Sequence, residues 1–347
     1  MSPIAQLLER HRARFEQAPP ALWVNPPADL SPSLVHDEST VFVQDWALQC
    51  ALESNGLASV FASTLPPLAG EGPVFFSIPR EKARLRMMAE ALAAAMAASE
   101  TNRPLLAAGE ARAGGRSAAR HLETAFEQVR KIDSARHCVL YEASQPHNSG
   151  ACDLASWMSA WPLQTPAGTL KIHSLPGVFA HGSLDEGTQL LLEHLPGLLT
   201  QRPRQVLDLG CGTGVIGAAA LRLQPELDLT LADSSALALE ASRATLNANA
   251  LTARCVPSDG LSAFQGHEGA RHRFDLVLSN PPFHEGHHER DDRGAGVFEG
   301  IERVLAPGGR LVLVVNTHLP WPRWLDQQFG GHEVLAHNRR FQLLSAS

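Results

Sequence analysis

The sequence predicts an α/β fold built on doubly wound, mainly parallel sheets. Short apolar runs with strand character alternate with helical segments along most of the chain, which is typical of parallel sheets covered by helices. A glycine-rich turn at 210–214 follows one of these runs and opens a helix, as ligand-binding turns in such sheets do. The pattern occurs in both halves of the chain, so we expect two tandem domains, 1–155 and 156–347.

The second half carries the clearer pattern. One expected helix spans Val215–Gln224. The next is rich in alanine and leucine, begins after a cap at Ser234 or Ser235, and runs through Asn247. Two shorter strand-like runs end the chain, after five expected strands at Gln205–Leu209, Leu227–Ala232, Ala253–Pro257, Phe274–Ser279 and Arg310–Asn316.

The first half shows the same alternation less clearly. We expect a helix over Glu81–Ala98 and a second helix that follows Gly114-Gly115 and extends through Val129. Residues 144–169 are rich in Ser, Pro, Gly and Trp and are expected to form a linker or hairpin between the domains. The expected strands of this half are Pro73–Ser77, Pro104–Ala108 and Cys138–Tyr141.

The two halves look like distant copies of one another. Phe75–Pro79 matches Val277–Pro281 in character, and a helix and then a strand follow each segment. In this alignment Ile78 stands where Asn280 stands, and the first half lacks a glycine-rich turn. We therefore interpret the first half as a degenerate copy without the ligand site. Two unrelated α/β domains would show a similar order, because strand–helix–strand units are common.

The composition indicates a globular protein that does not span a membrane. Of 347 residues, 44% are apolar and 19% charged, which excludes a mostly disordered chain. No run approaches the roughly 18–20 apolar residues of a membrane span. Charged residues stand near the N-terminus, where an export signal would be apolar. Five scattered cysteines without a CxxC pair argue against a disulfide framework or a cysteine zinc site. We expect a reduced, cytoplasmic protein.

The distribution of charge is uneven. The net charge of −7 argues mildly against non-specific coating of nucleic acid, whose phosphates attract basic proteins. Between Arg80 and Arg136, however, eleven Lys and Arg residues outnumber seven Asp and Glu residues, which gives a local excess of four positive charges. This basic segment is compatible with RNA contact, because arginine suits phosphate recognition. Solvation of a helix face is the other interpretation.

The glycine-rich turn allows two cofactor hypotheses. Gly212, Gly214 and Gly217 spell GxGxxG, and Asp233 follows at the distance of a ribose-binding acid, as in NAD-binding turns. Asp208 at the strand end favours S-adenosylmethionine instead. A carboxylate there would repel the two phosphates of a dinucleotide, whereas it suits the sulfonium and ammonium groups of S-adenosylmethionine.

A second motif follows the expected strand Phe274–Ser279. It consists of Asn280, Pro281, Pro282 and Phe283. The prolines hold the backbone extended and remove two N–H donors, which leaves carbonyl acceptors beside the Asn280 amide oxygen. A row of acceptors suits the exocyclic amine of a planar base, and the Phe283 ring can stack on that base.

The run His284–His288 matches the zinc-protease pattern HExxH. That chemistry needs a helix that presents both histidines on one face. Prolines precede this run, Gly286 interrupts it, and no third ligand is evident. We therefore expect a loop beside the active site and no metal.

These motifs together resemble class I S-adenosylmethionine-dependent methyltransferases that act on amino groups. The turn 208–214, the segment 231–235 and the run 279–283 carry this resemblance. Further segments resemble the ribosomal RNA small subunit methyltransferase C family: Leu175–Phe179, Leu184–Leu190, Asn280–Gly286, Leu319-Pro320 and Phe329-Gly330. The resemblance implies two tandem Rossmann-like methyltransferase domains, of which the N-terminal one is degenerate and serves RNA positioning or folding support.

The resemblance also implies an activity and a role for each motif. The reaction would be methylation of a guanine N2 amine in 16S rRNA, and rRNA or the small ribosomal subunit would be the partner. Asp208, Gly210, Gly212 and Gly214 would line the methionine end of S-adenosylmethionine, which Gly187 and Thr188 would close. Asp233 would bind the ribose and Asp259 the adenine amine. Asn280 and the Pro281 carbonyl would hold the target amine in the segment completed by Pro282, and Phe283 would stack on the base.

Three alternatives remain open from the sequence. The same chemistry on large-subunit rRNA is carried by similarly duplicated enzymes. Methylation of a protein glutamine amide usually accompanies NPPY rather than the NPPF found here. A non-enzymatic RNA-binding or assembly factor would not need the acidic and glycine positions that this chain retains.

Overall fold

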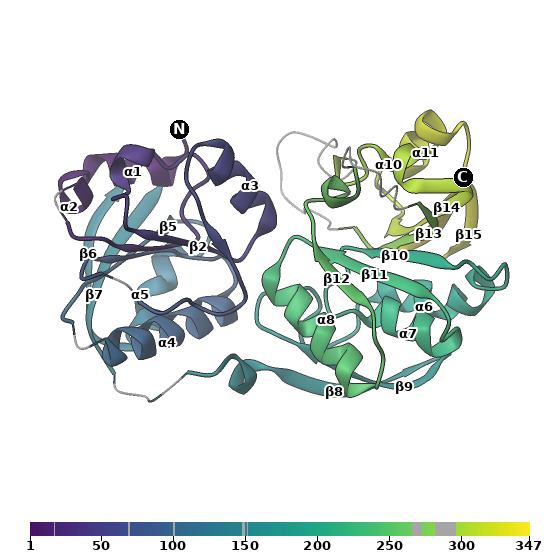
Figure 1. Cartoon of the computed structure of the whole chain (residues 1–347), viewed down its shortest axis with the longest axis horizontal. Coiled ribbons are helices and arrows are strands. Elements are labelled where there is room, and N and C mark those ends of the chain that lie inside the picture. The colour runs from purple at the N-terminus through teal and green to yellow at the C-terminus, as the bar shows by residue number, and fades with distance from the viewer. Residues whose placement is uncertain are drawn as a thin grey trace. The chain divides into compact units, whose positions relative to one another are not determined.

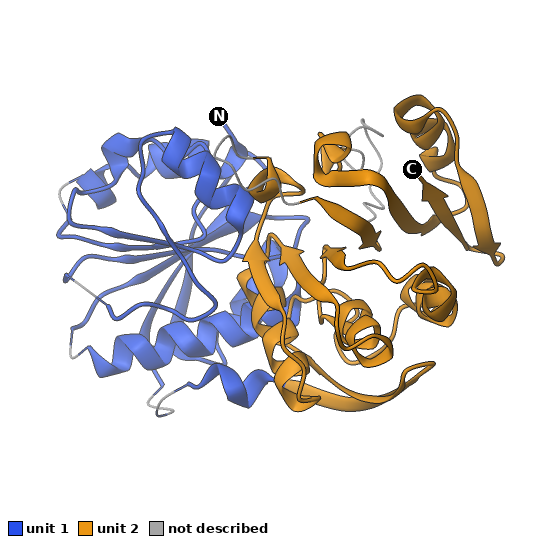
Figure 2. Cartoon of the chain, turned by 45° about the vertical axis from the view of Figure 1, so that its right-hand side comes forward, with its two compact units in different colours: residues 1–158 blue, residues 159–347 orange. Residues whose placement is uncertain are grey.

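The computed structural model describes residues 1–16, 18–68, 70–99, 101–147, 150, 152–265, 273–281 and 296–347. The chain divides into two compact units, Met1–Met158 and Ser159–Ser347, coloured separately in Figure 2. Within the described residues, no helix is long and apolar enough to cross a membrane. Each unit is an α/β domain in its own right, as the sequence predicts.

The second unit is built on a seven-stranded sheet with the order β12-β11-β10-β13-β14-β16-β15. The five strands from β12 to β14 run parallel, and β16 pairs antiparallel with both β14 and β15. The central strands β10 and β13 are buried along nearly their whole length, and β14 is buried over 311–315, as expected for strands covered on both faces. Their bounds are β10 Gln205–Leu209, β11 Asp228–Asp233, β12 Arg254–Pro257, β13 Phe274–Ser279, β14 Leu305–Asn316, β15 Glu333–His337 and β16 Phe341–Ala346.

Helices cover both faces of this sheet. Figure 1 shows α6 (Glu186–Leu198), α7 (Val215–Leu223) and α8 (Ala236–Ala248) on one face, and α10 (Ile301–Val304) and α11 (Trp321–Phe329) on the other. An antiparallel hairpin of β8 (Ser159–Thr165) and β9 (Gly168–Ser174) precedes the sheet. It is anchored to α8, because the His173 N–H donates to Thr245 Oγ1 at 2.9 Å. Part of the expected linker or hairpin is therefore a real hairpin that belongs to the second unit.

The first unit repeats the same sheet order, β3-β2-β1-β4-β5-β7-β6, with the same parallel and antiparallel pairings. Ser77 ends β4 as Ser279 ends β13, so Ile78 and Asn280 hold equivalent places, as the alignment of the two halves predicts. The strands are β1 Leu22–Val24, β2 Thr40–Val43, β3 Val60–Phe61, β4 Val74–Ser77, β5 Leu105–Glu110, β6 Phe126–Ala135 and β7 Cys138–Pro146.

The main difference between the two units lies in the segments that follow β10 and β1. In the second unit α7 follows β10, whereas in the first unit only a 3-10 turn, Pro32–Leu34, lies between β1 and β2. The remaining helices of the first unit are α1 Pro3–Arg10, α2 Ala13–Glu16, α3 Trp46–Ser54, α4 Lys82–Ala98 and α5 Ala118–Leu122. Trp23, Phe75 and Leu140 lie in the core between the sheet and the helices α1, α2 and α3.

One expected element is wrong. The second helix of the first half ends at Leu122 instead of continuing through Val129. Residues from Phe126 form β6, which pairs antiparallel with β7. Arg136 and His137, both with positive φ, make the tight turn between these strands. Pairing across a hairpin outweighs the helical tendency of the short segment 126–129.

Candidate active site

The glycine-rich turn joins β10 to α7 at the carboxyl edge of the sheet. The N–H groups of Gly210 and Cys211 both donate to the Ala232 carbonyl, at 2.8 and 3.0 Å, so the turn is fixed to the end of β11. Gly210 and Gly212 have positive φ, and a Cβ added to either would meet no atom within 4 Å. The turn therefore presents bare backbone to open space, where a ligand can approach closely.

Glycine is required at position 214 for a different reason, which is close packing. It also has positive φ, but an added Cβ would lie 2.9 Å from Ser242 Oγ and 3.1 Å from a Leu231 methyl group. These atoms belong to α8 and β11. Gly214 thus lets α7 start tightly against its neighbours, and its contacts are made with the protein interior.

Asp208 is fully buried beneath the turn. Its Oδ2 accepts a hydrogen bond from the Gly217 N–H at 2.9 Å, and its Oδ1 has no partner among the described residues. Burial raises the pKa of Asp208 to about 7; the Gly217 N–H opposes this shift and the Asp233 carboxylate adds to it. The carboxyl group is thus poised to ionise fully when a cation comes near.

Asp233 at the end of β11 binds the turn directly. Its Oδ2 accepts from the Gly212 N–H and its Oδ1 from the Ser235 N–H, both at 2.9 Å. The Asp233 carbonyl in turn accepts from the Ser258 N–H at 3.1 Å, which holds the loop of Asp259 beside it. The Asp259 side chain is exposed. Two carboxylates therefore stand after adjacent strands, and each retains acceptor capacity.

Asn280, directly after β13, is fixed by two residues at the start of α6. Its Nδ2 donates to Asp185 Oδ2 and to Thr188 Oγ1, each at 2.9 Å. Asp185 also caps α6, since its Oδ2 accepts from the Thr188 N–H at 3.0 Å. These bonds set the amide orientation, and the Asn280 Oδ1 remains buried with no partner among the described residues.

A narrow cleft of about 40 Å³ brings these parts together within the second unit. Gly210 and Gly212 line it together with Asp185, Thr188 and Asn280. Gly187 lies close by, where an added Cβ would stand 3.0 Å from Asp185 Oδ2 and from the Phe341 ring. Bare backbone and an unsatisfied amide acceptor therefore share one cleft. The walls of this cleft thus offer close approach to the turn backbone and, at the Asn280 amide, an acceptor for an N–H group.

The role of Asp185 in fixing the Asn280 amide could not be predicted from the sequence. That residue lies 95 positions before Asn280, and no local spacing connects them. The Ser/Thr/Asp-x-x pattern at a helix start was the available signal, because it predicts a capping carboxylate at Asp185. Phe179 was also not singled out as a site residue. Its ring is 57% exposed and lines the same cleft.

Some predicted residues lie outside the described part of the chain. These are Pro282, Phe283 and the whole run His284–His288. Pro281 is described and buried. Within the described ranges, no group of three or more His, Cys, Asp or Glu side chains has the arrangement of a metal site.

The first unit lacks the equivalent groups. Strand register places Val24 at the position of Asp208 and Gln44 at that of Asp233. Gln44 is only 1% exposed and is occupied internally: its Nε2 donates to the Ser63 carbonyl at 3.1 Å, and its Oε1 accepts from Arg84 at 3.2 Å. No acidic side chain therefore stands ready for a ribose at these two positions.

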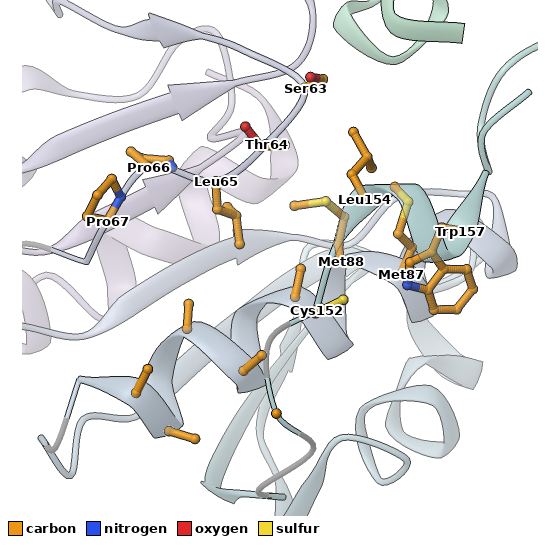
Figure 3. Close-up of a pocket in the computed structure, with 16 residues that line it drawn as sticks. Ser63, Thr64, Leu65, Pro66, Pro67, Met87, Met88, Cys152, Leu154 and Trp157 are labelled. Atoms are coloured by element: carbon orange, nitrogen blue, oxygen red, sulfur yellow. The ribbon is translucent and has the colours of Figure 1, made fainter. Parts of the chain in front are cut away.

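The first unit instead has an apolar pocket along α4, shown in Figure 3. Its walls come from α4, the segment after β3 and the segment before β8, including Leu65, Met88 and Trp157. None of the described residues that line it is charged. Its chemistry differs from that of the cleft in the second unit.

Comparison with known proteins gives consistent results. The family model described as Methyltransferase small domain matches residues 169–345, and the one described as Methyltransferase small domain N-terminal matches residues 5–161. Ribosomal RNA small subunit methyltransferase C of Pseudomonas entomophila is 38% identical over 283 residues, 82% of this chain and 81% of that protein. The protein of the same name from Shewanella denitrificans is 37% identical over 299 residues, 84% and 82% of the two chains.

A solved structure has the same fold over the whole chain. It is the T. thermophilus 16S rRNA N2 G1207 methyltransferase in complex with AdoMet and guanosine. The TM-score is 0.81 at 24% sequence identity, and the match covers 100% of this chain and 92% of that chain. Two tandem Rossmann-like methyltransferase domains are thereby confirmed.

The contacts of Gly214 predict a large loss of stability on substitution. Gly214→Ala forces a left-handed conformation on alanine, at about 1–2 kcal/mol, and adds a clash with Ser242, for which overpacking typically costs about 1–3 kcal/mol. Gly330→Ala is the matched control, because Gly330 has φ +79° and open space around it. Thermal unfolding of both variants should show the larger loss at Gly214. Equal losses would contradict the packing role.

The raised pKa of Asp208 predicts a pH-dependent effect of Asp208→Asn. Between about pH 4 and pH 7 the folded chain holds a proton that the unfolded chain has released, so this group's contribution to stability falls as pH rises through that range. The neutral amide avoids this loss. Chemical denaturation should therefore show the variant gaining stability over the wild type between about pH 5 and pH 8, by on the order of a few kcal/mol. A pH-independent difference would contradict the shift.

Proposed function

Because this chain belongs to the ribosomal RNA small subunit methyltransferase C family, we propose that it transfers a methyl group from S-adenosylmethionine to the N2 amine of a guanine in 16S rRNA. Membership confirms the resemblance expected from the sequence. The solved relative binds AdoMet and guanosine, which are the two ligand classes that the cleft of the second unit suits. The observation that carries the proposal is the buried, unpartnered Oδ1 of Asn280 beside the glycine turn.

The cofactor side of the proposal follows the turn. S-adenosylmethionine supplies an electrophilic methyl group when bound. The open backbone at Gly210 and Gly212 would receive its methionine end, and Thr188 and Gly187 would close that end. Gly214 would maintain the shape of the turn. Asp208 beneath it favours the cationic groups electrostatically, and proximity of a positive charge lowers the raised pKa of this carboxyl group.

The two outer carboxylates would hold the nucleoside part of the cofactor. Asp233, fixed by two backbone N–H groups, would accept from the ribose hydroxyls. Asp259 is exposed on the adjacent loop, and its oxygens would accept from the adenine amine. A dinucleotide fits less well, because the buried Asp208 would face its phosphates.

Asn280 would hold the target amine of guanine. Its Nδ2 is occupied by Asp185 and Thr188, so the amide cannot turn over and its Oδ1 can only accept. The Pro281 carbonyl would add a second acceptor. Phe283 would stack on the base, and the exposed Phe179 ring offers a second apolar surface at the cleft. Together these groups would orient both amine hydrogens.

The chemistry needs alignment more than a strong base. The amine of guanine is a weak nucleophile because its lone pair is delocalised into the ring. Acceptors at its hydrogens stabilise the nitrogen as positive charge develops during attack. Its proton then leaves readily to water. Most of the rate enhancement would come from holding nitrogen, methyl carbon and sulfur in line.

Nucleoside analysis is the direct test. Ribosomal RNA from a deletion strain should lack one N2-methylguanosine in the 16S fraction, and the wild-type gene should restore it. Loss from the 23S fraction would point to large-subunit rRNA, and an intact RNA profile would reject the proposal. Calorimetry should show saturable binding of S-adenosylhomocysteine and none of NAD.

Action on ribosomal RNA also implies that the protein works in the cytoplasm.

Asn280→Ala should lower kcat by about 10²–10³, the scale for loss of one preorganised polar contact at a reacting centre. The affinity for S-adenosylhomocysteine should change little, because the main proposed cofactor contacts lie at the turn and Asp233. Single-turnover methyl transfer to 16S rRNA or isolated small subunits measures the first quantity, and calorimetry measures the second. Near wild-type turnover would remove Asn280 from the mechanism.

Asp185→Asn should lower kcat by about tenfold, since a neutral acceptor holds the Asn280 amide less firmly than a carboxylate does. Asparagine is an equally good helix cap, so the unfolding temperature should stay close to that of the wild type. Glu186→Gln is the control: this neighbouring carboxylate pairs on the surface with Arg340 at 3.0 Å. A fall in cofactor affinity without a fall in kcat would show that Asp185 acts elsewhere.

A further inference from the structure

A basic pocket lies in the first unit at the carboxyl ends of β4 and β5. Its lining includes Glu110 and small residues of the loop after β5. It also includes four cationic side chains: Arg80, Lys82, Arg112 and Arg116. All four are exposed. The pocket is thus an accessible surface with a net positive charge.

The cations of this pocket are little neutralised by the protein. Arg80 lies 3.8 Å from Glu110, with both side chains well exposed. Lys82, Arg112 and Arg116 form no ion pair within the described residues. Other arginines of the same unit do have acidic partners: Arg14 and Arg130 pair with Glu142 at 3.0 and 2.7 Å, and Arg86 pairs with Glu90 at 2.9 Å. Uncompensated like charges on one surface favour an anionic ligand.

The backbone holds these side chains together. Gly114 has φ +98°, and a Cβ there would lie 3.3 Å from the Pro79 carbonyl oxygen, so the loop after β5 folds closely over the segment after β4. The Ala111 N–H donates to the His137 carbonyl at 2.7 Å, which fixes the start of the loop to the β6–β7 turn. The loop after β5 therefore holds Arg112 and Arg116 beside Arg80.

The position of the pocket in the sheet indicates which kind of ligand it binds. It occupies the edge of the sheet where the second unit carries Asn280 after β13. In the first unit the apolar Ile78 replaces that acceptor and is 7% exposed, so the position of Asn280 offers no acceptor for a base amine. This edge of the first unit thus carries cationic donors where the second unit carries an acceptor of N–H groups.

We propose that this pocket binds the phosphate backbone of the RNA substrate through Lys82, Arg112 and Arg116. Guanidinium groups bind phosphate oxygens in a bidentate manner, and Lys82 adds a point charge. The ligand is RNA because the inference rests on the proposed function, which makes ribosomal RNA the substrate. Binding here is independent of base sequence and anchors the RNA while the second unit acts on one guanine.

Salt dependence of RNA binding tests the proposal in the full-length protein. The triple variant Lys82→Gln/Arg112→Gln/Arg116→Gln removes three positive charges from the pocket. The matched control Arg14→Gln/Arg86→Gln/Arg130→Gln removes three from ion-paired surface positions of the same unit. The probe is a labelled 16S rRNA fragment that contains the methylated guanine. Its affinity is measured by fluorescence anisotropy over a range of salt concentrations, with thermal unfolding as a check on folding.

The pocket variant should reduce the slope of log affinity against log salt by about 2, since each phosphate contact contributes roughly 0.7 on single strands. The KM for RNA should rise while kcat at saturating RNA and the affinity for S-adenosylhomocysteine stay unchanged. The control should retain the wild-type slope. An unchanged slope in the pocket variant, or an equal reduction in the control, would overturn the proposal.

A different partner would give a different result. If the pocket variant binds naked RNA normally but loses affinity for the assembled small subunit, the pocket recognises an acidic protein surface and the RNA proposal fails. The proposed methyl transfer is judged separately. A wild-type protein that binds RNA with the expected slope but methylates none would reject the activity and leave the phosphate pocket intact.

Discussion

Parallel pairing of β10 with both β11 and β13 is the constraint on which the site depends. It places the carboxyl ends of three strands side by side, so the turn after β10, Asp233 at the end of β11 and Asn280 after β13 meet at one edge. Asp185 then ties this edge to the start of α6 by accepting from Asn280. Backbone hydrogen bonds thus set where each group stands, and the half-buried Asp185 carboxylate and the Thr188 hydroxyl set the orientation of the Asn280 amide.

The two units show that the same sheet can carry different side chains at its carboxyl edge. Both have the same strand order and the same pairings, yet different side chains follow equivalent strands. In the first unit Gln44 stands at the position equivalent to Asp233, where it forms internal hydrogen bonds with Arg84 and the Ser63 carbonyl. Arg84 is half-buried, and loss of contact with water lowers its pKa. The sheet survives this exchange because its stability comes from buried strands and not from the residues at their ends.

The sequence was most informative where a motif lies next to a strand. The glycine turn and Asn280 follow runs whose apolar character predicts β10 and β13, so their meeting at one edge could be anticipated. The first three strands of the first unit have only three, four and two residues. Runs this short show no periodicity, so the sequence does not predict them as strands. The Asp185–Asn280 bond joins residues 95 positions apart, and only the tertiary fold determines such a contact.

Two buried oxygens without partners among the described residues, Oδ1 of Asp208 and Oδ1 of Asn280, lie at the strand ends that border the glycine turn. Leaving a buried polar group unsatisfied costs about 1–3 kcal/mol. The first unit provides an internal comparison, because the equivalent positions hold Val24 and Ile78, which incur no such cost. The fold therefore does not require polar groups at these positions. The two proposed ligands, one cationic and one an amine, would complete the bonding of these oxygens on either side of the glycine turn.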